Sequence, residues 1–304
     1  MDIEPILHSA GFERIQLTDD AVEKIIVNDD LKNKYLALAA NVDRLFKAIL
    51  PDTRAGEFAA KRKVFTVLAD KIRALTPAAD ISEVMGAVED LLDESVTARP
   101  YAIRESGVLY DLSQIDFEAL KQQFEQGRKR TEAERLRGTI NAKLRRLVRL
   151  NRSRMDYLEE FQRLINEYNS GSRNVEEFFD ELIEFAQRLN EEEQRAMAQN
   201  LSEEELAVFD ILTRPGPDLT EKEKLEVARI GRELLDTLKR EKLVLDWRKR
   251  QQSRAAVRIL IEELIWRLPE RYTDKMCQRK SAQIYQHIYD NYWGAGRSIY
   301  AMAA

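Results

Sequence analysis

The sequence is poor in cysteine, histidine, glycine and proline. Its 304 residues include one cysteine, two histidines, 11 glycines and 7 prolines. A single cysteine, Cys277, excludes an internal disulfide and a cysteine-based metal cluster. Because His8 and His287 lie far apart in the chain, a zinc site would need mostly carboxylate ligands, which is uncommon. Few turn residues and only 8% aromatic residues also argue against an all-β fold.

Long hydrophobic runs are missing too. No apolar stretch approaches the roughly 18 residues that a membrane helix needs. The first residues, Met-Asp-Ile-Glu-Pro, are acidic and lack the charged region that opens a signal peptide. We therefore expect a cytoplasmic protein without a membrane partner, in a reducing compartment where a lone thiol stays free.

Motifs for common enzyme chemistries are also lacking. The sequence contains no P-loop, no Gly-rich dinucleotide fingerprint after a strand, no H-E-x-x-H and no G-x-S-x-G. Acidic pairs such as those at 191–193 and 203–205 fall where helix first turns are expected, and there they offset the positive end of the helix dipole. We predict that this chain is not an enzyme by itself and has no catalytic residue, metal, cofactor or small-molecule substrate of its own.

Helical periodicity is what the sequence has in abundance. Apolar residues recur at spacings of three and four, as at Leu38, Val42, Leu45 and Ile49. The same pattern recurs from Val64 to Leu75 and from Val84 to Leu92. We predict an all-α protein made of multi-helix bundles, with an N-terminal bundle over 1–112 and a second helical domain over 113–304.

One helix is predicted to be unusually long. From 131 to 168 the apolar stripe has no proline in it, which predicts a central amphipathic helix of about 57 Å at 1.5 Å per residue. Its start, Thr131 to Glu134, has the form of a capping box, in which a hydroxyl and a carboxylate cap each other's backbone. Three further candidate boxes begin at Asn190, Ser202 and Thr220.

Charge is unevenly distributed along the chain. The net charge is −5, yet residues 121–154 hold 12 basic and 3 acidic side chains. On a helical wheel, an arginine stripe lies about 120–180° from the buried stripe; its members are Arg135, Arg145, Arg146, Arg149 and Arg152. Such a face is typical of a track for phosphates or of a contact with an acidic protein. Equally, it fits a solvated face paired with the chain's own acidic segments. The candidate contacts are Arg128, Lys129, Arg130, Arg135, Arg145, Arg146, Arg149 and Arg152.

A second basic zone begins at the run LVLDWRKRQQSRAAVR, residues 243–258. A tryptophan beside opposite charges is typical of an anchor at a protein interface. The alternative is a tryptophan that packs into a corner between two helices. The candidate contacts here are Asp246, Trp247, Arg248, Lys249, Arg254 and Arg258.

That run, followed by LPERY and IYQHIYDNY, resembles the C-terminal end of the restriction (R, motor) subunit of type I restriction–modification enzymes. The upstream segments NRSRMDYLEEFQRLINEYN and LSEEELAVFDILTRPGPDLTEKEK are similar as well. YLALAANVDRLFKAILPD resembles the helical region that follows the motor domains in those subunits.

The resemblance implies that the chain corresponds to part of a subunit that is an ATP-dependent DNA translocase and endonuclease. ATP and Mg²⁺ are then expected only in the nuclease and motor domains, whose motifs this sequence lacks. The implied role is a non-catalytic assembly domain, with the methyltransferase and specificity subunits as partners. The alternative hypothesis is a module that binds duplex DNA without sequence preference through its arginine stripe.

Overall fold

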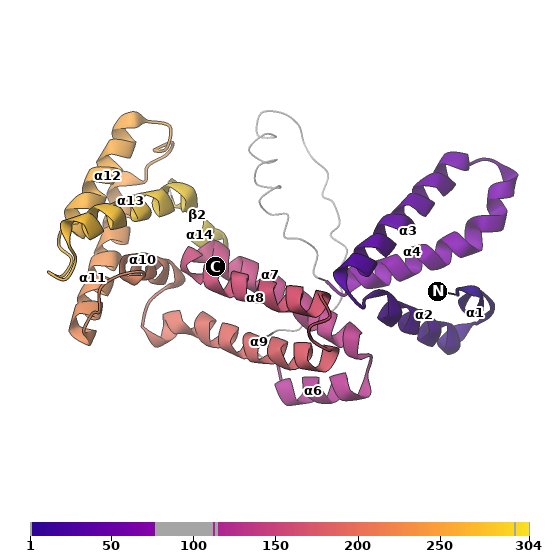
Figure 1. Cartoon of the computed structure of the whole chain (residues 1–304). Helices are drawn as coiled ribbons and strands as arrows, with labels where there is room; N and C mark the ends of the chain where they lie inside the picture. The colour runs from indigo at the N-terminus through magenta and orange to yellow at the C-terminus, as the bar shows by residue number, and fades with distance from the viewer. Residues whose placement is uncertain (1, 77–111, 113–114, 295, 304) are drawn as a thin grey trace. The chain divides into compact units, whose positions relative to one another are not determined.

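The computed structural model describes residues 2–76, 112, 115–294 and 296–303, and the described chain is almost entirely α-helical (Figure 1). The predicted all-α class is confirmed. The described strands form one short antiparallel pair, β1 (Tyr292–Gly294) and β2 (Arg297–Ser298). No helix among the described residues is both long and apolar enough to cross a bilayer.

The chain divides into two compact units. Unit 1 comprises residues 1–144 and 159–190, and unit 2 comprises residues 145–158 and 191–304. The predicted domain boundary at residue 112 adjoins residues outside those described, so it stays a prediction.

The described helices are α1 (Glu4–His8), α2 (Gly11–Ile25), α3 (Asp29–Ile49), α4 (Ala59–Ala74), α6 (Phe117–Gln126), α7 (Lys129–Leu150), α8 (Met155–Asn169), α9 (Val175–Ala198), α10 (Glu203–Thr213), α11 (Glu221–Thr237), α12 (Gln251–Ile265), α13 (Asp274–Asn291) and α14 (Ile299–Ala303). Two short 3-10 helices are η1 (Thr53–Phe58) and η2 (Arg152–Arg154), and a short π-helix is η3 (Leu238–Lys242).

In unit 1, α3 and α4 pair as a hairpin beside α2 (Figure 1). The core of this part holds Val22, Ile25, Leu68 and Ile72. The apolar face predicted from Leu38 to Ile49 forms on α3, but it lies exposed to solvent rather than in a bundle core. The helix predicted over 84–92 lies outside the described residues.

The predicted long helix over 131–168 is wrong in one respect, because it is broken in the middle. Helix α7 ends at Leu150 and α8 begins at Met155. Between them Asn151 accepts a hydrogen bond from the backbone N–H of Ser153 and caps the short turn at Arg152–Arg154. Asparagine competes for backbone groups in this way, so it interrupts a helix where the apolar pattern alone does not.

Helix caps follow the local sequence in some places and not in others. The predicted capping boxes at Ser202 and Thr220 are confirmed, each with its glutamate three residues on. The two others are wrong, because Thr131 lies inside α7 and Asn190 lies inside α9. The start of α7 is capped instead by Glu23 of α2, whose carboxylate accepts from the backbone N–H groups of Arg130 and Thr131.

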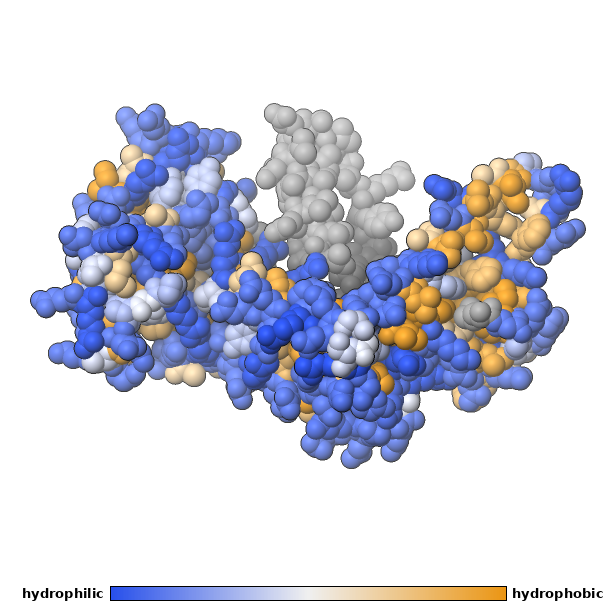
Figure 2. All heavy atoms as spheres, in the orientation of Figure 1, coloured by the Kyte–Doolittle hydropathy of each residue, from blue (hydrophilic) through white to orange (hydrophobic). Residues whose placement is uncertain are grey.

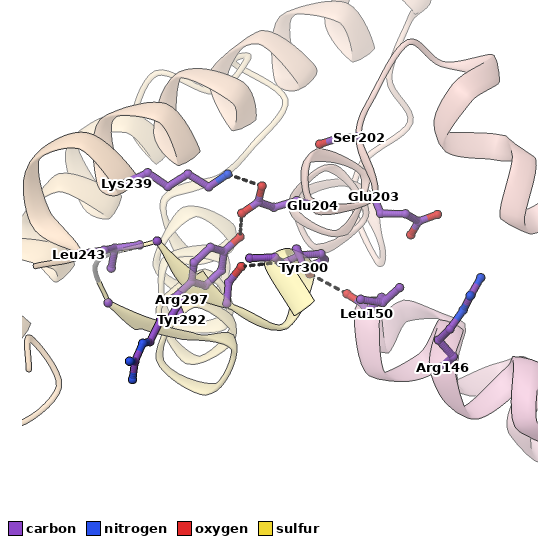
Figure 3. A pocket seen from close by; sticks show the side chains of 14 residues that line it. Arg146, Leu150, Ser202, Glu203, Glu204, Lys239, Leu243, Tyr292, Arg297 and Tyr300 are labelled. Atoms are coloured by element: carbon purple, nitrogen blue, oxygen red, sulfur yellow. Dashed lines mark hydrogen bonds and ion pairs between the residues drawn. The ribbon is translucent and has the colours of Figure 1, made fainter. Parts of the chain in front are cut away.

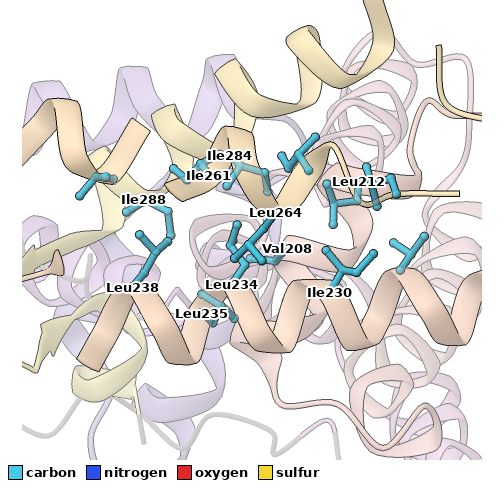
Figure 4. Close-up of a cluster of buried hydrophobic side chains, with 14 of the residues drawn as sticks. Val208, Leu212, Ile230, Leu234, Leu235, Leu238, Ile261, Leu264, Ile284 and Ile288 are labelled. Atoms are coloured by element: carbon cyan, nitrogen blue, oxygen red, sulfur yellow. The ribbon is translucent and has the colours of Figure 1, made fainter. Parts of the chain in front are cut away.

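Unit 2 is built around a continuous apolar core. Helices α10, α11, α12 and α13 each contribute a buried stripe, and the stripes meet as Figure 4 shows. Its central members include Val208, Leu234, Ile261 and Ile284, all at most 1% exposed. This core forms the base for the turn between η3 and α12, which carries the second predicted basic zone.

Candidate docking surface

The basic face of α7 within unit 1 is paired with acidic side chains of the same unit. Arg128 lies 2.9 Å from Asp20, and Lys129 lies 3.0 Å from Glu176. The hydrogen bond from Lys129 holds the pKa of the Glu176 carboxyl below its usual range. Arg135 pairs with Glu132 one turn away, at 2.9 Å, and Arg130 lies half-buried beside them in the sequence.

The remaining arginines of the predicted stripe lie in unit 2 and are also largely paired. Arg146 lies 2.6 Å from Glu193, and Arg152 lies 3.2 Å from Asp290. Arg145 is exposed and Arg149 is half-buried. These pairs agree with the interpretation of a face neutralised by the chain's own acidic segments, since a phosphate would have to displace a carboxylate from each of them.

A charged cluster that the sequence did not reveal lies at the break after α7. Arg154 is fully buried and donates to Glu192 at 3.0 Å and to Glu203 at 2.9 Å. Asp210, also buried, accepts from Asn151 at 2.7 Å and from Ser153 at 2.9 Å. These bonds fix the turn after α7 to α9 and α10 within unit 2.

The second basic zone forms a tightly held turn. Trp247 is fully buried, and its indole Nε1 donates to the carbonyl of Tyr292 at 3.0 Å. Its ring meets the edge of Tyr289. The interpretation of this tryptophan as a packed helix-corner residue agrees with the structure. It does not lie on the surface where it could itself touch a partner.

The basic residues of this zone mostly brace the same turn. The guanidinium of Arg248 lies 4.8 Å from the ring centre of Tyr289 and donates to main-chain carbonyls at the end of α13. Arg254 donates to the carbonyl of Arg248 at 2.8 Å. Arg258 covers the ring of Tyr285 at 4.6 Å, a cation–π contact.

What the turn presents to solvent was not singled out from the sequence. Val244 and Leu245 are 46% and 65% exposed and precede the buried Trp247 by three and two residues. Asp246, between Leu245 and Trp247, has a φ of 57°, the left-handed region that asparagine and aspartate tolerate best. Lys249, whose side chain is 82% exposed, pairs with Asp246 at 3.2 Å. An apolar pair with a charged neighbour is therefore held outward by a rigid base.

A hollow of about 570 Å³ lies near this turn, between α10, the end of α7 and the β1–β2 hairpin (Figure 3). Several of its polar side chains bond to one another or to the main chain. Tyr292 donates to Glu204 at 2.5 Å, and Lys239 pairs with the same carboxylate. Tyr300 donates to the carbonyl of Leu150 at 2.6 Å. Burial, together with the charge of Glu204, raises the pKa of the Tyr292 hydroxyl well above its usual range. These groups build part of the wall of the hollow.

His287 belongs to the same structural network. Its ring nitrogens face Asn291 at 3.0 Å and Tyr300 at 3.1 Å, and the side chain is buried. Burial, assisted by Arg152 and opposed by Asp290, lowers the pKa of His287 to about 4. A neutral imidazole with both nitrogens occupied has a structural role here.

One protein family matches this chain. No curated protein and no solved structure gives a significant match to this chain. The model of one family, described as type I restriction enzyme HindI endonuclease subunit-like, C-terminal, matches residues 1–290. That match covers nearly the whole chain and agrees with the resemblance found in its motifs. The chain therefore belongs to the family of C-terminal regions of HindI-like type I restriction enzyme endonuclease subunits.

Proposed function

We propose that the chain is a non-catalytic assembly domain, which docks an ATP-dependent DNA translocase and endonuclease subunit onto its methyltransferase–specificity core. The observation that carries the proposal is the exposed apolar pair, Val244 and Leu245, on a turn whose base is the fully buried Trp247. Family membership supports an origin in such an endonuclease subunit. The exposed turn is the surface that we propose for docking.

The physical argument concerns preorganisation. A partner that covers Val244 and Leu245 removes apolar area from water without first having to order a loop, because Trp247 and Arg248 already fix the backbone. Lys249 at the edge of the pair suits the polar rim that surrounds the apolar centre of a typical interface. Affinity then arises from the apolar pair, and orientation arises from the rim.

The experiment is a titration of the whole chain against the purified methyltransferase–specificity core by biolayer interferometry, at about 50 and 150 mM salt. We expect binding that survives the higher salt, since apolar contacts are not screened. The double variant V244S/L245S should weaken binding at least tenfold. Leu225→Ser is the matched control, because Leu225 on α11 is also exposed and lies in the same unit. Absence of binding by the wild-type chain, or equal losses in both variants, contradicts the proposal.

Duplex DNA binding through the arginine stripe is the weaker alternative. Five of the eight candidate contacts in residues 121–154 have side chains paired with carboxylates, which reduces the positive charge available to phosphates. A 30-base-pair duplex in a parallel titration tests it. Salt-sensitive binding that is lost in R145E/R146E/R149E, without any binding to the protein core, would replace docking as the function.

A further inference from the structure

Helix α3 carries a second apolar surface, in unit 1, that the proposed docking turn does not involve. Its members are Leu31, Tyr35, Leu38, Val42, Leu45 and Ile49, at successive spacings of 4, 3, 4, 3 and 4. We call these six residues the α3 seam. At 100° per residue, its five aliphatic members fall within about 60° of arc. Leu38, Leu45 and Ile49 are 55%, 62% and 47% exposed.

The seam is distinct from the side of α3 that packs inside unit 1. Asp43 pairs with Arg62 of α4, the ring of Phe46 lies 4.8 Å from the same guanidinium, and Ala39 on this side of α3 is buried. Tyr35 bridges the two sides, with its hydroxyl donating to the carbonyl of Phe65 at 3.2 Å. Figure 2 shows hydrophobic residues gathered at the surface over the α3–α4 hairpin.

The residue types in the seam match a specific packing mode. With the leucines at Leu31, Leu38 and Leu45 as d positions, the a positions are Tyr35, Val42 and Ile49. Leucine at d with β-branched residues at a is the pattern of two helices packed as a coiled coil. A spacing that averages 3.5 residues favours a partner helix over a sheet or a loop, because that period keeps the seam facing one neighbouring helix.

The charge around the seam selects the kind of helix. Residues 29–74, which span α3 and α4, contain ten lysines and arginines against six acidic residues, a net charge of +4 in a chain whose overall charge is −5. Lys34 lies exposed directly beside the seam, at a g position of the same heptad. Flanking charges of this kind set partner choice in coiled coils, where opposite charges attract and like charges repel.

We propose that the α3 seam binds an acidic amphipathic helix of a partner protein, about three heptads long, with leucine or valine at its core positions and glutamate at the flanks. A second copy of this chain is disfavoured because two hairpins of charge +4 would repel each other. The proposal concerns unit 1 and is independent of the docking turn in unit 2.

The test uses the full chain and fluorescence anisotropy with two labelled 21-residue peptides. Both peptides have valine or isoleucine at a and leucine at d, but one has glutamate at e and g and the other has lysine. We expect saturable binding of the glutamate peptide, weakened severalfold by raising salt from about 50 to 300 mM, and at least tenfold weaker binding of the lysine peptide.

The variant L38S/L45S should reduce binding of the glutamate peptide at least tenfold. F12S/I15S on α2 is the matched control, since Phe12 and Ile15 are exposed large apolar residues in the same unit. Because all four side chains lie at the surface, both variants should fold, which circular dichroism checks. L38S/L45S should leave binding to the methyltransferase–specificity core unchanged, so this proposal and the proposed function fail separately.

Three outcomes overturn the proposal. Equal binding of both peptides, or no binding of either, would show that the α3 seam does not select an acidic helix. A concentration-dependent dimer that L38S/L45S abolishes assigns the seam to a second copy. Residues 77–98 contain six acidic residues and no lysine or arginine. If only a chain lacking them binds the glutamate peptide, the seam is assigned to that segment of this chain instead.

Discussion

The indole nitrogen of Trp247 donates a 3.0 Å hydrogen bond to the carbonyl oxygen of Tyr292, which joins the turn before α12 to strand β1. Both side chains are almost fully buried, so this bond lies beneath the exposed pair Val244 and Leu245 rather than beside it. The surface proposed for docking and the core of unit 2 therefore depend on the same tryptophan.

Trp247→Ala should destabilise unit 2 by about 3–5 kcal/mol, because a large buried side chain is replaced by a cavity. Trp247→Phe removes the indole N–H and leaves the Tyr292 carbonyl unpaired. We expect the lost hydrogen bond to reduce stability by about 1–2 kcal/mol, in addition to the effect of the change in packing. Urea unfolding followed by tryptophan fluorescence measures this, since Trp266 and Trp293 remain as reporters in unit 2. An alanine variant as stable as the wild type would show that the indole does not hold the turn.

Gly294→Ala should disturb the docking turn from the opposite side. Gly294 has a φ of 110°, and an added Cβ would collide with the carbonyl oxygen of Val244. We expect a loss of about 3 kcal/mol in stability and a clear loss of binding to the methyltransferase–specificity core. Gly296→Ala is the control. Its φ of 79° is also positive, but no atom lies within 4 Å of the added Cβ, so strain of about 1 kcal/mol is all that it adds.

Arg154→Leu should destabilise unit 2 by about 3 kcal/mol, because the buried Glu192 carboxylate loses its 3.0 Å partner and keeps Arg195, at 3.3 Å, as its cation. Arg267→Leu serves for comparison. Arg267 makes a two-point pair with Glu233 in the same unit, but both side chains are at least 40% exposed, so its loss should change stability much less than the loss of Arg154. Equal melting temperatures for the two variants would contradict a stabilising role for the buried pair.

The pKa of His287, lowered to about 4 by burial, makes unit 2 sensitive to mild acid. Between pH 6.5 and 4 the unfolded chain binds a proton at this histidine and the folded chain does not. The free energy of unfolding therefore falls as the pH falls through this range, by an amount on the order of 3 kcal/mol. His287→Gln should flatten this part of the stability profile, whereas His8→Gln, at an exposed site, should not change it. Urea midpoints measured from pH 7 to 4 decide between these results.

Apolar spacing predicted the helices well because it is a local property. Leu136, Ile140 and Leu144 are all fully buried along α7, as their spacing of four predicts. The capping boxes at Ser202 and Thr220 were equally predictable, since donor and acceptor lie three residues apart. Spacing also showed that Leu38 and Leu45 share a face, but it could not show that this face lacks a covering helix among the described residues.

The candidate site was less predictable because it depends on contacts between distant segments. The sequence identifies Trp247 and its charged neighbours as a group, yet it does not show that Trp247 faces inward and Leu245 outward. Four of the five stripe arginines lie on α7, and Arg152 lies in the turn after it. The sequence could not show that Arg128 and Lys129 find their acidic partners as far away as Asp20 and Glu176. Asp210 looked like one acidic residue among many, and only the fold brings Asn151 and Ser153 to it.

The cap that Glu23 provides for α7 has a consequence for how the chain folds. The carboxylate of Glu23 and the backbone N–H groups that it binds are separated by 107 and 108 residues. Closing a loop of that length is entropically unfavourable, and contacts of high sequence separation form slowly. The first turn of α7 should therefore become ordered late, after α2 has found it. Refolding followed by pulsed hydrogen exchange should show the amides of Arg130 and Thr131 protected after those of Leu136 and Ile140.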